Sequence, residues 1–506
     1  MASLSSPAAT NDVKAAARQR GHSAIDFVSA TTGVAAKTMR NELNRMVNAV
    51  QDPAKKQIFD AEMQSFFLLF NRYLTEKAKG EKIDWEKIQP PAPSHVLKYE
   101  TLPHVDKNIL NKLAVLKLNG GLGTTMGCVG PKSVIEVREG MTFLDLSVRQ
   151  IEHLNSEYNV NVPFILMNSF NTDDDTARII QKYQNHNINI LTFNQSRYPR
   201  VNRESLLPLP RDATSDKSQW YPPGHGDVFD ALHNSGLLDK LIAAGKEYIF
   251  VSNVDNLGAV VDLNIFQTMI DTQAEYLMEV TDKTKADVKG GTIIDYQGQV
   301  RLLEVAQVPK EHIDEFKSIK RFSIFNTNNI WMNLKAVKRV VENDELSLEI
   351  IVNNKKTDNG EAVIQLETAI GAAIKHFRNA VGMNVPRSRF LPVKSCSDLL
   401  LIKSGLYNLS HGVLTMDPSR QVQGTPVIKL GRHFTKVTAF ESRFRSIPDI
   451  SDLDHLTIEG AVVIGKRVKL SGTVIIVATE GNSIEIPDGS ILENKLITGS
   501  LSIIDH

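Results

Sequence analysis

The sequence predicts an α/β protein with a mostly parallel sheet, preceded by helices and followed by a parallel β-helix. Short apolar runs alternate with helical patterns in the middle of the chain, and a six-residue repeat occupies its C-terminal region. With 506 residues, the chain exceeds the roughly 250–300 residues at which one hydrophobic core stops growing. We therefore expect more than one domain.

Helices are predicted near the N-terminus. Apolar residues recur at helical spacing from Met39 to Val50, and Pro53 then interrupts the helix. A second amphipathic stretch with an aromatic stripe runs from Ile58 to Phe70 and ends before Gly80, and we expect its rings to pack in a core. The proline-rich segment Gln89–Pro93 cannot form regular hydrogen-bonded structure, so it marks a linker.

Buried strands and helices alternate in the central region. Leu113–Leu118, Phe164–Met167 and Tyr248–Val251 have the composition of buried strands, whereas Leu144–Leu154 and Thr176–Tyr183 have helical patterns. Such alternation is typical of an α/β sheet, which binds its ligands at the carboxyl ends of the strands.

The C-terminal region carries a countable repeat. Two sets of aliphatic residues recur at every sixth position: Leu456, Val462, Val468 and Val474, and Ile458, Ile464, Leu470 and Ile476. Glycines at positions 460 and 472 lie between them. A period of six with paired aliphatic residues predicts a parallel β-helix in which each short strand stacks on the previous one.

Composition narrows the possible partners and the compartment. Lys+Arg and Asp+Glu number 58 each, so we expect neither a nucleic-acid partner nor a membrane-surface partner. No apolar run approaches the roughly 18 residues of a membrane span, and the N-terminus lacks a signal-peptide pattern. The two cysteines, Cys128 and Cys396, suit a reducing compartment, and we expect a cytoplasmic protein.

A glycine-rich loop is the most informative stretch of the chain. It follows the predicted strand Leu113–Leu118 and reads Asn119-Gly-Gly-Leu-Gly-Thr-Thr-Met-Gly-Cys-Val-Gly-Pro-Lys132. Lacking Cβ atoms, Gly120, Gly121 and Gly123 can adopt left-handed conformations and let backbone N–H groups approach phosphate oxygens. Lys132 adds a full positive charge. The sequence therefore predicts a phosphate-binding loop.

Two better-known glycine loops do not fit this spacing. The stretch contains no G-x-x-x-x-G-K-[ST] motif, and its glycines are spaced one residue too widely for the dinucleotide fingerprint G-x-G-x-x-G. A nicotinamide-dependent dehydrogenase, the alternative at the level of the fold, is therefore disfavoured.

With this loop and further motifs, the chain resembles the eukaryotic UDP-glucose pyrophosphorylases of the nucleotide-sugar pyrophosphorylase superfamily. The likeness extends from about Phe59 to His506, and the first fifty residues match least. The matching motifs are Lys117–Thr124, Asn168–Thr172, Thr192–Pro199, Trp220–Asp227, Val251–Asn256, Phe325–Asn329 and Asn384–Lys394.

The resemblance implies a Rossmann-like, GT-A-like nucleotidyltransferase fold with a mixed sheet and a C-terminal left-handed β-helix. It also implies three parts: a tail and helical segment over residues 1–100, a catalytic nucleotide-binding domain over 101–395, and a β-helical oligomerisation domain over 396–506. Animal and fungal members of the family assemble through their C-terminal domains. We therefore expect a homo-octamer, with the uncapped end Leu501–His506 available for contacts between subunits.

The reaction that the resemblance implies joins the UMP part of UTP to glucose 1-phosphate, giving UDP-glucose and pyrophosphate. UDP-glucose would then serve glycogen, glucan and glycoconjugate synthesis. The attacking phosphate oxygen is already ionised, so catalysis needs positioning and charge neutralisation rather than a base. Mg²⁺ is the expected cofactor.

By resemblance, Lys132 and Lys394 are the catalytic residues and contact the reacting phosphates from two sides. Asp255 is expected to bind Mg²⁺ together with UTP oxygens, since hard oxygen ligands suit this ion. Gln195 offers both an amide donor and an acceptor to the uracil edge. The expected UTP-binding residues are Leu118, Asn119, Gly120, Gly121, Lys132, Gln195, Gly224, Asp255 and Lys394.

Glucose 1-phosphate is expected to contact a second set of residues. His225 would donate a hydrogen bond to the sugar phosphate, and Glu304 and Asn328 would bind hexose hydroxyls. Gly290, in the turn Lys289–Thr292, would bring backbone to the sugar. The full expected set is Gly120, Gly121, His225, Asn253, Val254, Asp255, Gly290, Glu304 and Asn328.

Two alternative functions stay open at this point. The chain could act more broadly on UDP-sugars or UDP-N-acetylhexosamines, although the related N-acetylhexosamine enzymes usually carry an Arg where this loop reads Thr124–Gly127. It could also be a non-catalytic nucleotide-binding scaffold, which the joint presence of Lys132, Asp255 and Lys394 disfavours.

Overall fold

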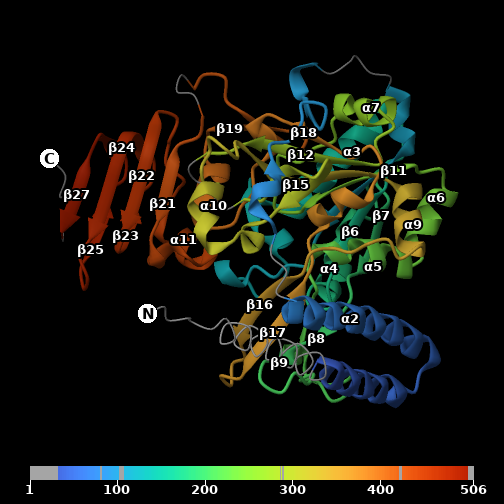
Figure 1. The fold of residues 1–506 in the computed structure, drawn as a ribbon. Helices are drawn as coiled ribbons and strands as arrows, with labels where there is room; N and C mark the ends of the chain where they lie inside the picture. Colours follow the sequence, from blue (N-terminus) through green and yellow to red (C-terminus); the bar gives the residue numbers. More distant parts are fainter. Residues whose placement is uncertain are drawn as a thin grey trace, which may run out of the picture.

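The protein is described by a computed structural model that covers residues 32–79, 83–101, 107–284, 287, 290–420 and 424–499. A central α/β body lies between two extensions (Figure 1). Helices near the N-terminus pack against one side of the body, and a stack of strands projects from it toward the C-terminus. The expected N-terminal tail, and Leu501 and Ile503 at the C-terminal end, lie outside the described residues.

An eight-stranded mixed sheet forms the centre of the body, which confirms the predicted α/β class. Its strand order is β2-β18-β12-β15-β11-β3-β6-β7. Only β15 runs antiparallel to its neighbours, β12 and β11, and the other described pairs are parallel. The strands are β2 (Val96–Lys98), β18 (Val381–Asn384), β12 (Tyr276–Asp282), β15 (Ile324–Asn333), β11 (Tyr248–Asn253), β3 (Leu113–Leu118), β6 (Phe164–Asn168) and β7 (Ile190–Asn194).

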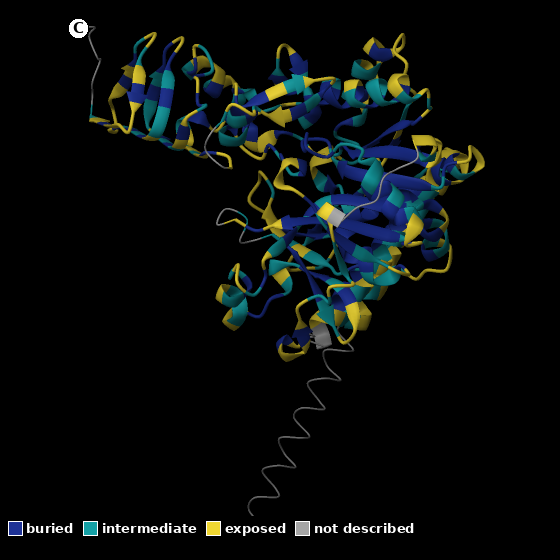
Figure 2. Cartoon of the chain, turned by 90° about the horizontal axis from the view of Figure 1, so that it is seen from above, coloured by how far each residue is buried: buried dark blue, intermediate teal, exposed yellow. Residues whose placement is uncertain are grey.

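Helices cover both faces of this sheet, because the side chains of its strands point alternately to the two faces. Ala114 and Leu116 of β3 belong to the core beneath α5 (Val228–Asn234), α6 (Leu237–Ala243) and α9 (Leu334–Glu342). Leu113 and Val115 belong to the core beneath α3 (Phe143–Tyr158) and α7 (Leu263–Asp271). In Figure 2, buried residues concentrate in these central strands and exposed residues lie at the periphery.

The predicted helices form, with shifted ends. The pattern over Leu144–Leu154 lies inside α3, which a Thr142–Asp145 capping box begins. The pattern over Thr176–Tyr183 starts earlier, as α4 (Asp173–Ile179), and finishes as a 3-10 turn over Ile180–Tyr183. Among the described residues, no helix combines the length and apolarity that a bilayer span requires.

The N-terminal helices attach to the body through aromatic packing, as the aromatic stripe predicts. Residues 32–49 are helical, and α2 (Pro53–Lys79) begins with proline at its first position. Phe59 of α2 meets the Trp220 ring edge-on with centroids 5.8 Å apart, and Phe66 meets the Tyr198 ring at 5.4 Å. These rings share one core with strands β8 (Tyr198–Pro199), β10 (Trp220–Tyr221), β9 (Val201–Asn202) and β17 (Ala362–Glu367), which also pairs with β16 (Ile351–Lys356).

The C-terminal region is a stack of parallel strands (Figure 1). The strands of one series pair in parallel: β21 (Val427–Leu430) with β22 (Leu453–Glu459), and β22 with β24 (Lys469–Ala478). Strand β24 also pairs in parallel with β26 (Ile491–Glu493) and with β27 (Leu496–Gly499). A separate parallel pair joins β23 (Ala461–Ile464) to β25 (Ser483–Ile486). Residues three repeats apart pair directly, as Leu456 does with Val474. All eight residues of the six-residue repeat are buried, with exposed fractions of 1% or less. The repeat therefore predicts the core-facing positions correctly.

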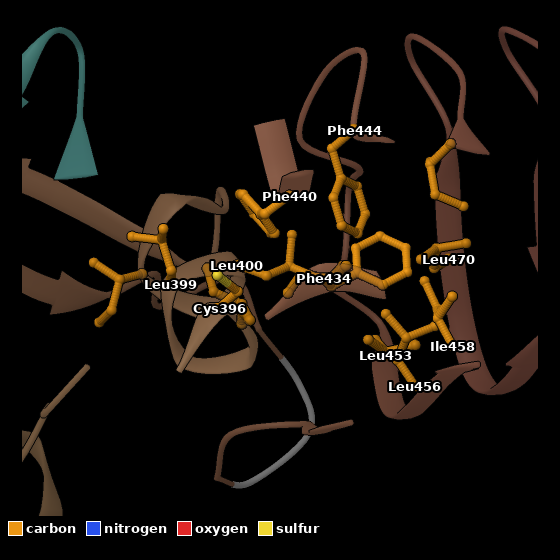
Figure 3. Packing of buried hydrophobic residues seen from close by; sticks show 14 of the residues in the cluster. Cys396, Leu399, Leu400, Phe434, Phe440, Phe444, Leu453, Leu456, Ile458 and Leu470 are labelled. Atoms are coloured by element: carbon orange, nitrogen blue, oxygen red, sulfur yellow. The ribbon is translucent and has the colours of Figure 1, made fainter. Parts of the chain in front are cut away.

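This stack shares a hydrophobic core with part of the central body. Figure 3 shows Leu399 and Leu400 of α10 (Cys396–Lys403) near Phe434, Phe440 and Phe444. Phe440 and Phe444 lie on and beside α11 (Val437–Arg443). Met126 of the glycine loop belongs to the same core. The remaining described elements are α8 (Ile313–Phe316), β1 (Ile88–Gln89), β4 (Glu136–Arg138), β5 (Met141–Thr142), β13 (Thr292–Tyr296), β14 (Gln299–Leu303), β19 (Tyr407–Ser410) and β20 (Val413–Met416).

Candidate active site

Three charged residues that are far apart in the sequence meet beside the central sheet. The Nζ atom of Lys132 lies 2.5 Å from Oδ2 of Asp255, and the Nζ atom of Lys394 lies 3.1 Å from the same oxygen. Asp255 is buried, with 4% of its surface exposed. The residues predicted to bind the reacting phosphates and the metal are therefore brought together.

The topology of the sheet explains this meeting. Strands β3 and β11 are parallel neighbours whose ends pair as Leu118 with Asn253, so the loops that follow them leave the same edge. The glycine loop follows β3, and Asp255 follows β11. The N–H of Val254 donates to the carbonyl oxygen of Leu118, which ties the two loops together.

The segment before Lys394 is tethered to the loop of Asp255. The N–H of Leu391 donates to Oδ1 of Asn256 at 2.8 Å, and the N–H of Val393 donates to the carbonyl oxygen of Asp255 at 3.3 Å. These two hydrogen bonds hold the backbone before Lys394 against the loop of Asp255 and thereby position Lys394.

The charges at this point suit a polyanionic ligand. Two ammonium groups face a single carboxylate, so an excess of positive charge is present. Oδ1 of Asp255 is buried and has no hydrogen-bond partner among the described residues. A buried carboxylate oxygen without a partner fits a hard cation such as Mg²⁺. The described part of the chain contains no cluster of three or more His, Cys, Asp or Glu side chains that could hold a metal ion.

The glycine loop departs from the left-handed conformations expected for it. Gly120, Gly121 and Gly123 have no positive φ, whereas Gly127 has φ 76°. Gly120 is needed for close packing, because a Cβ there would lie 1.9 Å from Nε2 of Gln195. A Cβ on Gly123 would lie 2.8 Å from Cβ of Cys128, while Gly121 has open space around it. The expectation of left-handed backbone is therefore wrong, and Gly120 and Gly123 serve close approach instead.

Asn119 anchors the loop. Its side-chain Nδ2 donates to Oδ1 of Asn168 at 2.8 Å and to Oγ1 of Thr176 at 3.0 Å, and its backbone N–H donates to the carbonyl oxygen of Met167. These donors are therefore committed within the protein, and a role for Asn119 in holding UTP would act through the placement of the loop.

His225 lies in a tight loop whose geometry fixes its protonation. Its Nδ1 accepts a hydrogen bond from the N–H of Ile370 at 3.0 Å. Burial, and then the nearby charge of Lys394, lower the pKa of His225 to about 4. The ring is therefore neutral at physiological pH, with a proton on Nε2 that it can donate. Before it, Gly224 has φ 84° and a Cβ there would lie 2.6 Å from the carbonyl oxygen of Thr368, so only glycine fits.

Two residues predicted to bind the sugar contact each other. Asn328 lies at a bulge in β15, where the register with β12 shifts, and has φ 63°. Its Nδ2 donates to Oδ1 of Asn253 at 3.2 Å. Left-handed backbone at a residue other than glycine costs about 1–3 kcal/mol and is often found at functional sites. The bulge thus directs an amide to the carboxyl end of β11.

Glu304 lies beside the glycine turn predicted for the sugar. A Cβ on Gly291 would lie 2.5 Å from its Oε1, so the carboxyl group lies directly on that glycine. Burial raises the pKa of Glu304 to about 7, against the opposing charge of Lys283. Gly290 packs against Phe325, while Lys289 lies outside the described residues.

Sequence reasoning misses a buried ionic layer behind the site. Lys117 is buried within β3, donates to Oγ of Ser252 at 2.8 Å and to the carbonyl oxygen of Ala259 at 2.9 Å, and burial lowers its pKa to about 7. Arg389 forms a two-point pair with Glu279, at 2.6 and 2.8 Å. A lysine inside an otherwise apolar strand is the signal that could have indicated this layer.

Comparisons with known proteins identify the family of the chain. The family described as UTP–glucose-1-phosphate uridylyltransferase matches residues 63–471. The chain is 62% identical to the probable UTP–glucose-1-phosphate uridylyltransferase of Schizosaccharomyces pombe, covering 96% of this chain and 97% of that protein. It is 60% identical to the corresponding protein of Saccharomyces cerevisiae, covering 96% and 98%.

Solved structures give the same result. The crystal structure of a UDP-glucose phosphorylase from Trypanosoma brucei superposes with a TM-score of 0.78 at 33% identity, covering 92% of this chain and 99% of that one. A mutant UDP-glucose pyrophosphorylase from Leishmania major in complex with UDP-glucose also gives a TM-score of 0.78 at 33% identity, covering 87% and 96%. From the family match and these identities, the chain belongs to the UTP–glucose-1-phosphate uridylyltransferase family.

Proposed function

We propose that this chain transfers the uridylyl group of UTP to glucose 1-phosphate, forming UDP-glucose and pyrophosphate. The observation that carries the proposal is the meeting of Lys132 and Lys394 on Asp255 at the edge where β3 and β11 end. Family membership supports the same reaction, because relatives at 60–62% identity carry its name.

The chemistry needs no protein base. A phosphate oxygen of glucose 1-phosphate attacks the α-phosphorus of UTP, the new phosphorus–oxygen bond forms, and the bond to the bridging oxygen of the β-phosphate breaks. Pyrophosphate leaves with that electron pair. The attacking oxygen is already ionised, so the two ammonium groups act by orienting the phosphates and by stabilising the charge that moves onto pyrophosphate.

The cofactor we propose is Mg²⁺, held by Asp255. The buried Oδ1 of this residue, which has no partner among the described residues, supports this assignment. When bound, the ion would neutralise phosphate charge. Because the described residues offer one carboxylate here and no acidic cluster, UTP oxygens would complete its coordination.

Substrate contacts follow the predicted sets. For the uridine part we propose Gln195 and Gly224 with the backbone around Leu118, Gly120 and Gly121. The packing of the Gln195 amide on Gly120 supports its position beside the glycine loop. For glucose 1-phosphate we propose His225, Asn253, Val254, Gly290, Glu304 and Asn328. The neutral His225 ring and the contact between Asn253 and Asn328 support this set.

We further propose the three-part division at residues 100 and 395, with the C-terminal strands forming a left-handed β-helix that assembles the chain as a homo-octamer. The parallel pairing of β22, β24 and β27 supports the β-helix. Exposed Ile491 and Leu496, at 69% and 68%, support an apolar contact at its end. A cytoplasmic location and the supply of UDP-glucose to glucan and glycoconjugate synthesis complete the proposal, and the free thiols of both cysteines suit such a compartment.

The test is pyrophosphate release from UTP with each of three sugar phosphates: glucose 1-phosphate, galactose 1-phosphate and N-acetylglucosamine 1-phosphate. We expect turnover with glucose 1-phosphate in Mg²⁺ and little in excess chelator. Preference for another sugar would favour the broader pyrophosphorylase alternative. The absence of release with all three, from a protein that still binds UTP, would favour the scaffold alternative.

A further inference from the structure

A short loop after β7 is held from two sides by acidic residues. We call Gln195–Arg197 the uridine loop, because Gln195 is proposed to bind uracil. The backbone N–H of Ser196 donates to Oδ2 of Asp227 at 2.6 Å, and its Oγ donates to Oδ1 of the same residue at 2.9 Å. From the other side, the N–H of Arg197 donates to Oε1 of Glu62 on α2 at 3.2 Å.

The two bonds of Asp227 connect two substrate-binding elements. Asp227 ends the 3-10 turn that starts at His225, so its backbone is continuous with the proposed sugar-phosphate donor. Ser196 follows Gln195 directly, and Gln195 packs on Gly120 of the phosphate loop. A displacement of Asp227 would therefore be passed to both sides of the site.

The contact is buried and suits a planar side chain that ends in two polar atoms. Gln195, Ser196 and Asp227 are exposed by only 7%, 6% and 5%. The N–H of Ser196 needs an acceptor here and its hydroxyl needs a hydrogen-bond partner. A carboxyl group meets both with its two oxygens, and an amide group can accept from the N–H with its oxygen and donate to the hydroxyl oxygen with its nitrogen, whereas a methyl group leaves both unpaired. The shape and hydrogen-bonding capacity of the Asp227 side chain therefore matter here, and not its charge alone.

The surroundings of Asp227 favour its neutral form. Burial raises the pKa of Asp227 well above its usual range, and the charges of Asp230 and Glu62 act in the same direction, whereas the hydrogen bonds from Ser196 lower it. The buried Tyr198 hydroxyl is a further titratable group in electrostatic contact with it. An asparagine therefore closely matches the neutral form of Asp227 in shape and charge.

We propose that Asp227 is a positioning residue that fixes the uridine loop to the His225 turn, so that Gln195 and His225 face their substrates in one arrangement. This inference rests on the proposed uridylyl transfer and adds a residue that touches neither substrate.

The experiment measures kcat and KM for both substrates in wild type, Asp227→Ala, Asp227→Asn and Ser196→Ala, with Asp230→Asn as a matched control on the adjacent helix. Asp227→Ala should raise KM for UTP and for glucose 1-phosphate by roughly 10-fold or more, because two buried donors lose their acceptor. Ser196→Ala loses one bond and should show a smaller shift in both constants. Asp227→Asn and Asp230→Asn should stay within about 3-fold of wild type.

Double variants separate positioning from a general loss of structure. If Asp227 acts through Gln195, adding Asp227→Ala to Gln195→Ala should not raise KM for UTP further. The same should hold for glucose 1-phosphate when it is added to His225→Ala. Three outcomes would overturn the inference. The increases in KM could multiply in both double variants, the KM values could be unchanged in Asp227→Ala, or Asp227→Asn could be as impaired as Asp227→Ala. A wild-type protein without uridylyl transfer would instead overturn the proposed function.

If Asp227→Ala does not fold, the comparison of Ser196→Ala with Ser196→Ala/Gln195→Ala gives the same test. This pair removes only the hydroxyl bond and leaves the buried acid in place. An increase in KM for UTP in the single variant that disappears in the Gln195→Ala background supports the inference, and no increase contradicts it.

Discussion

The ammonium group of Lys132 lies 2.5 Å from Oδ2 of Asp255, although 123 positions separate the two residues in the sequence. One residue closes the loop after β3 and the other closes the loop after β11. Because these strands are parallel neighbours, their loops emerge at one edge, and a cation and an anion face each other there. Lys394 joins them from a third segment. Removing any of the three should therefore disturb the same local field.

Lys132→Ala and Lys394→Ala should each lower kcat by roughly 100-fold or more, because a preorganised charge at a transition state contributes about 3–4 kcal/mol. Steady-state kinetics with UTP and glucose 1-phosphate would measure this loss. A change confined to KM would assign the lysine to ordinary substrate binding. Circular dichroism and Lys436→Ala, a substitution of an exposed lysine beside Gly127, control for folding and for nonspecific charge effects.

Asp255→Ala should abolish most activity at every Mg²⁺ concentration and weaken binding of the metal in the presence of UTP. The reason is that the buried Oδ1 is the carboxylate oxygen left without a partner among the described residues at this point. Titration of Mn²⁺ followed by electron paramagnetic resonance measures the binding directly. Near-normal activity in the variant at saturating Mg²⁺ would mean that the ion is held elsewhere. Asp262→Ala, which removes an acid that pairs with the buried Arg389 at 3.6 Å, is a control for loss of an acid.

Acid should destabilise the protein partly through His225. Burial depresses the folded pKa of this ring to about 4, below the value of about 6.5 for an unfolded chain. The unfolded state therefore binds a proton before the folded state does, and stability present above pH 6.5 is lost as the pH falls toward 4. His225→Asn keeps an acceptor for the N–H of Ile370 but does not titrate. Denaturant unfolding from pH 7 to 4 should lose less stability in this variant, and equal slopes would contradict the assignment.

Sugar recognition should depend on the ionisation of Glu304. Its pKa is raised to about 7, so the folded protein retains a proton that the unfolded chain loses near pH 4.5, and stability falls as pH rises through this window.

Glu304→Ala should weaken the binding of glucose 1-phosphate far more than that of UTP, and Asn328→Ala should have the same effect. Glu304→Gln should remove any change in KM for glucose 1-phosphate near pH 7. Equal weakening of both substrates would exclude these residues from the hexose pocket.

The sequence carries the architecture well because the relevant signals are local. The strand Leu113–Leu118 has uniformly apolar neighbours around Lys117, and the six-residue repeat lists core positions that are all buried. Lys132, Asp255 and Lys394 are identified through the resemblance, and each lies in the glycine loop or in a matching motif that follows a strand or a rigid segment. These features can be predicted without knowing which distant segment of the chain packs against them.

The parts that sequence reasoning misses depend on such distant contacts. Gly120 lacks a side chain because Gln195 lies against it, which no local turn pattern indicates. The pair of Arg389 with Glu279 joins segments 110 positions apart, and the left-handed Asn328 arises from a register shift between two strands. Asp227 belongs to a quoted motif, but its bond to Ser196 becomes evident only when β7 and the His225 turn are placed together.

The end of the strand stack should mediate self-association. Among the strands that the structure describes, β25, β26 and β27 each pair on one side only, so their outer hydrogen-bonding groups face away from the stack. Ile491 and Leu496 on these strands expose 69% and 68% of their surfaces. A symmetric contact would cover both features at once.

Light scattering should find a multimer of the 56.2 kDa chain, up to an octamer, and the double variant Ile491→Lys/Leu496→Lys should yield smaller species. Ile58→Lys, at a residue 64% exposed on α2, should leave the assembly unchanged. Because the phosphate loop lies in the central body, the smaller species should retain uridylyl transfer, and a wild-type monomer at micromolar concentration would contradict the assembly.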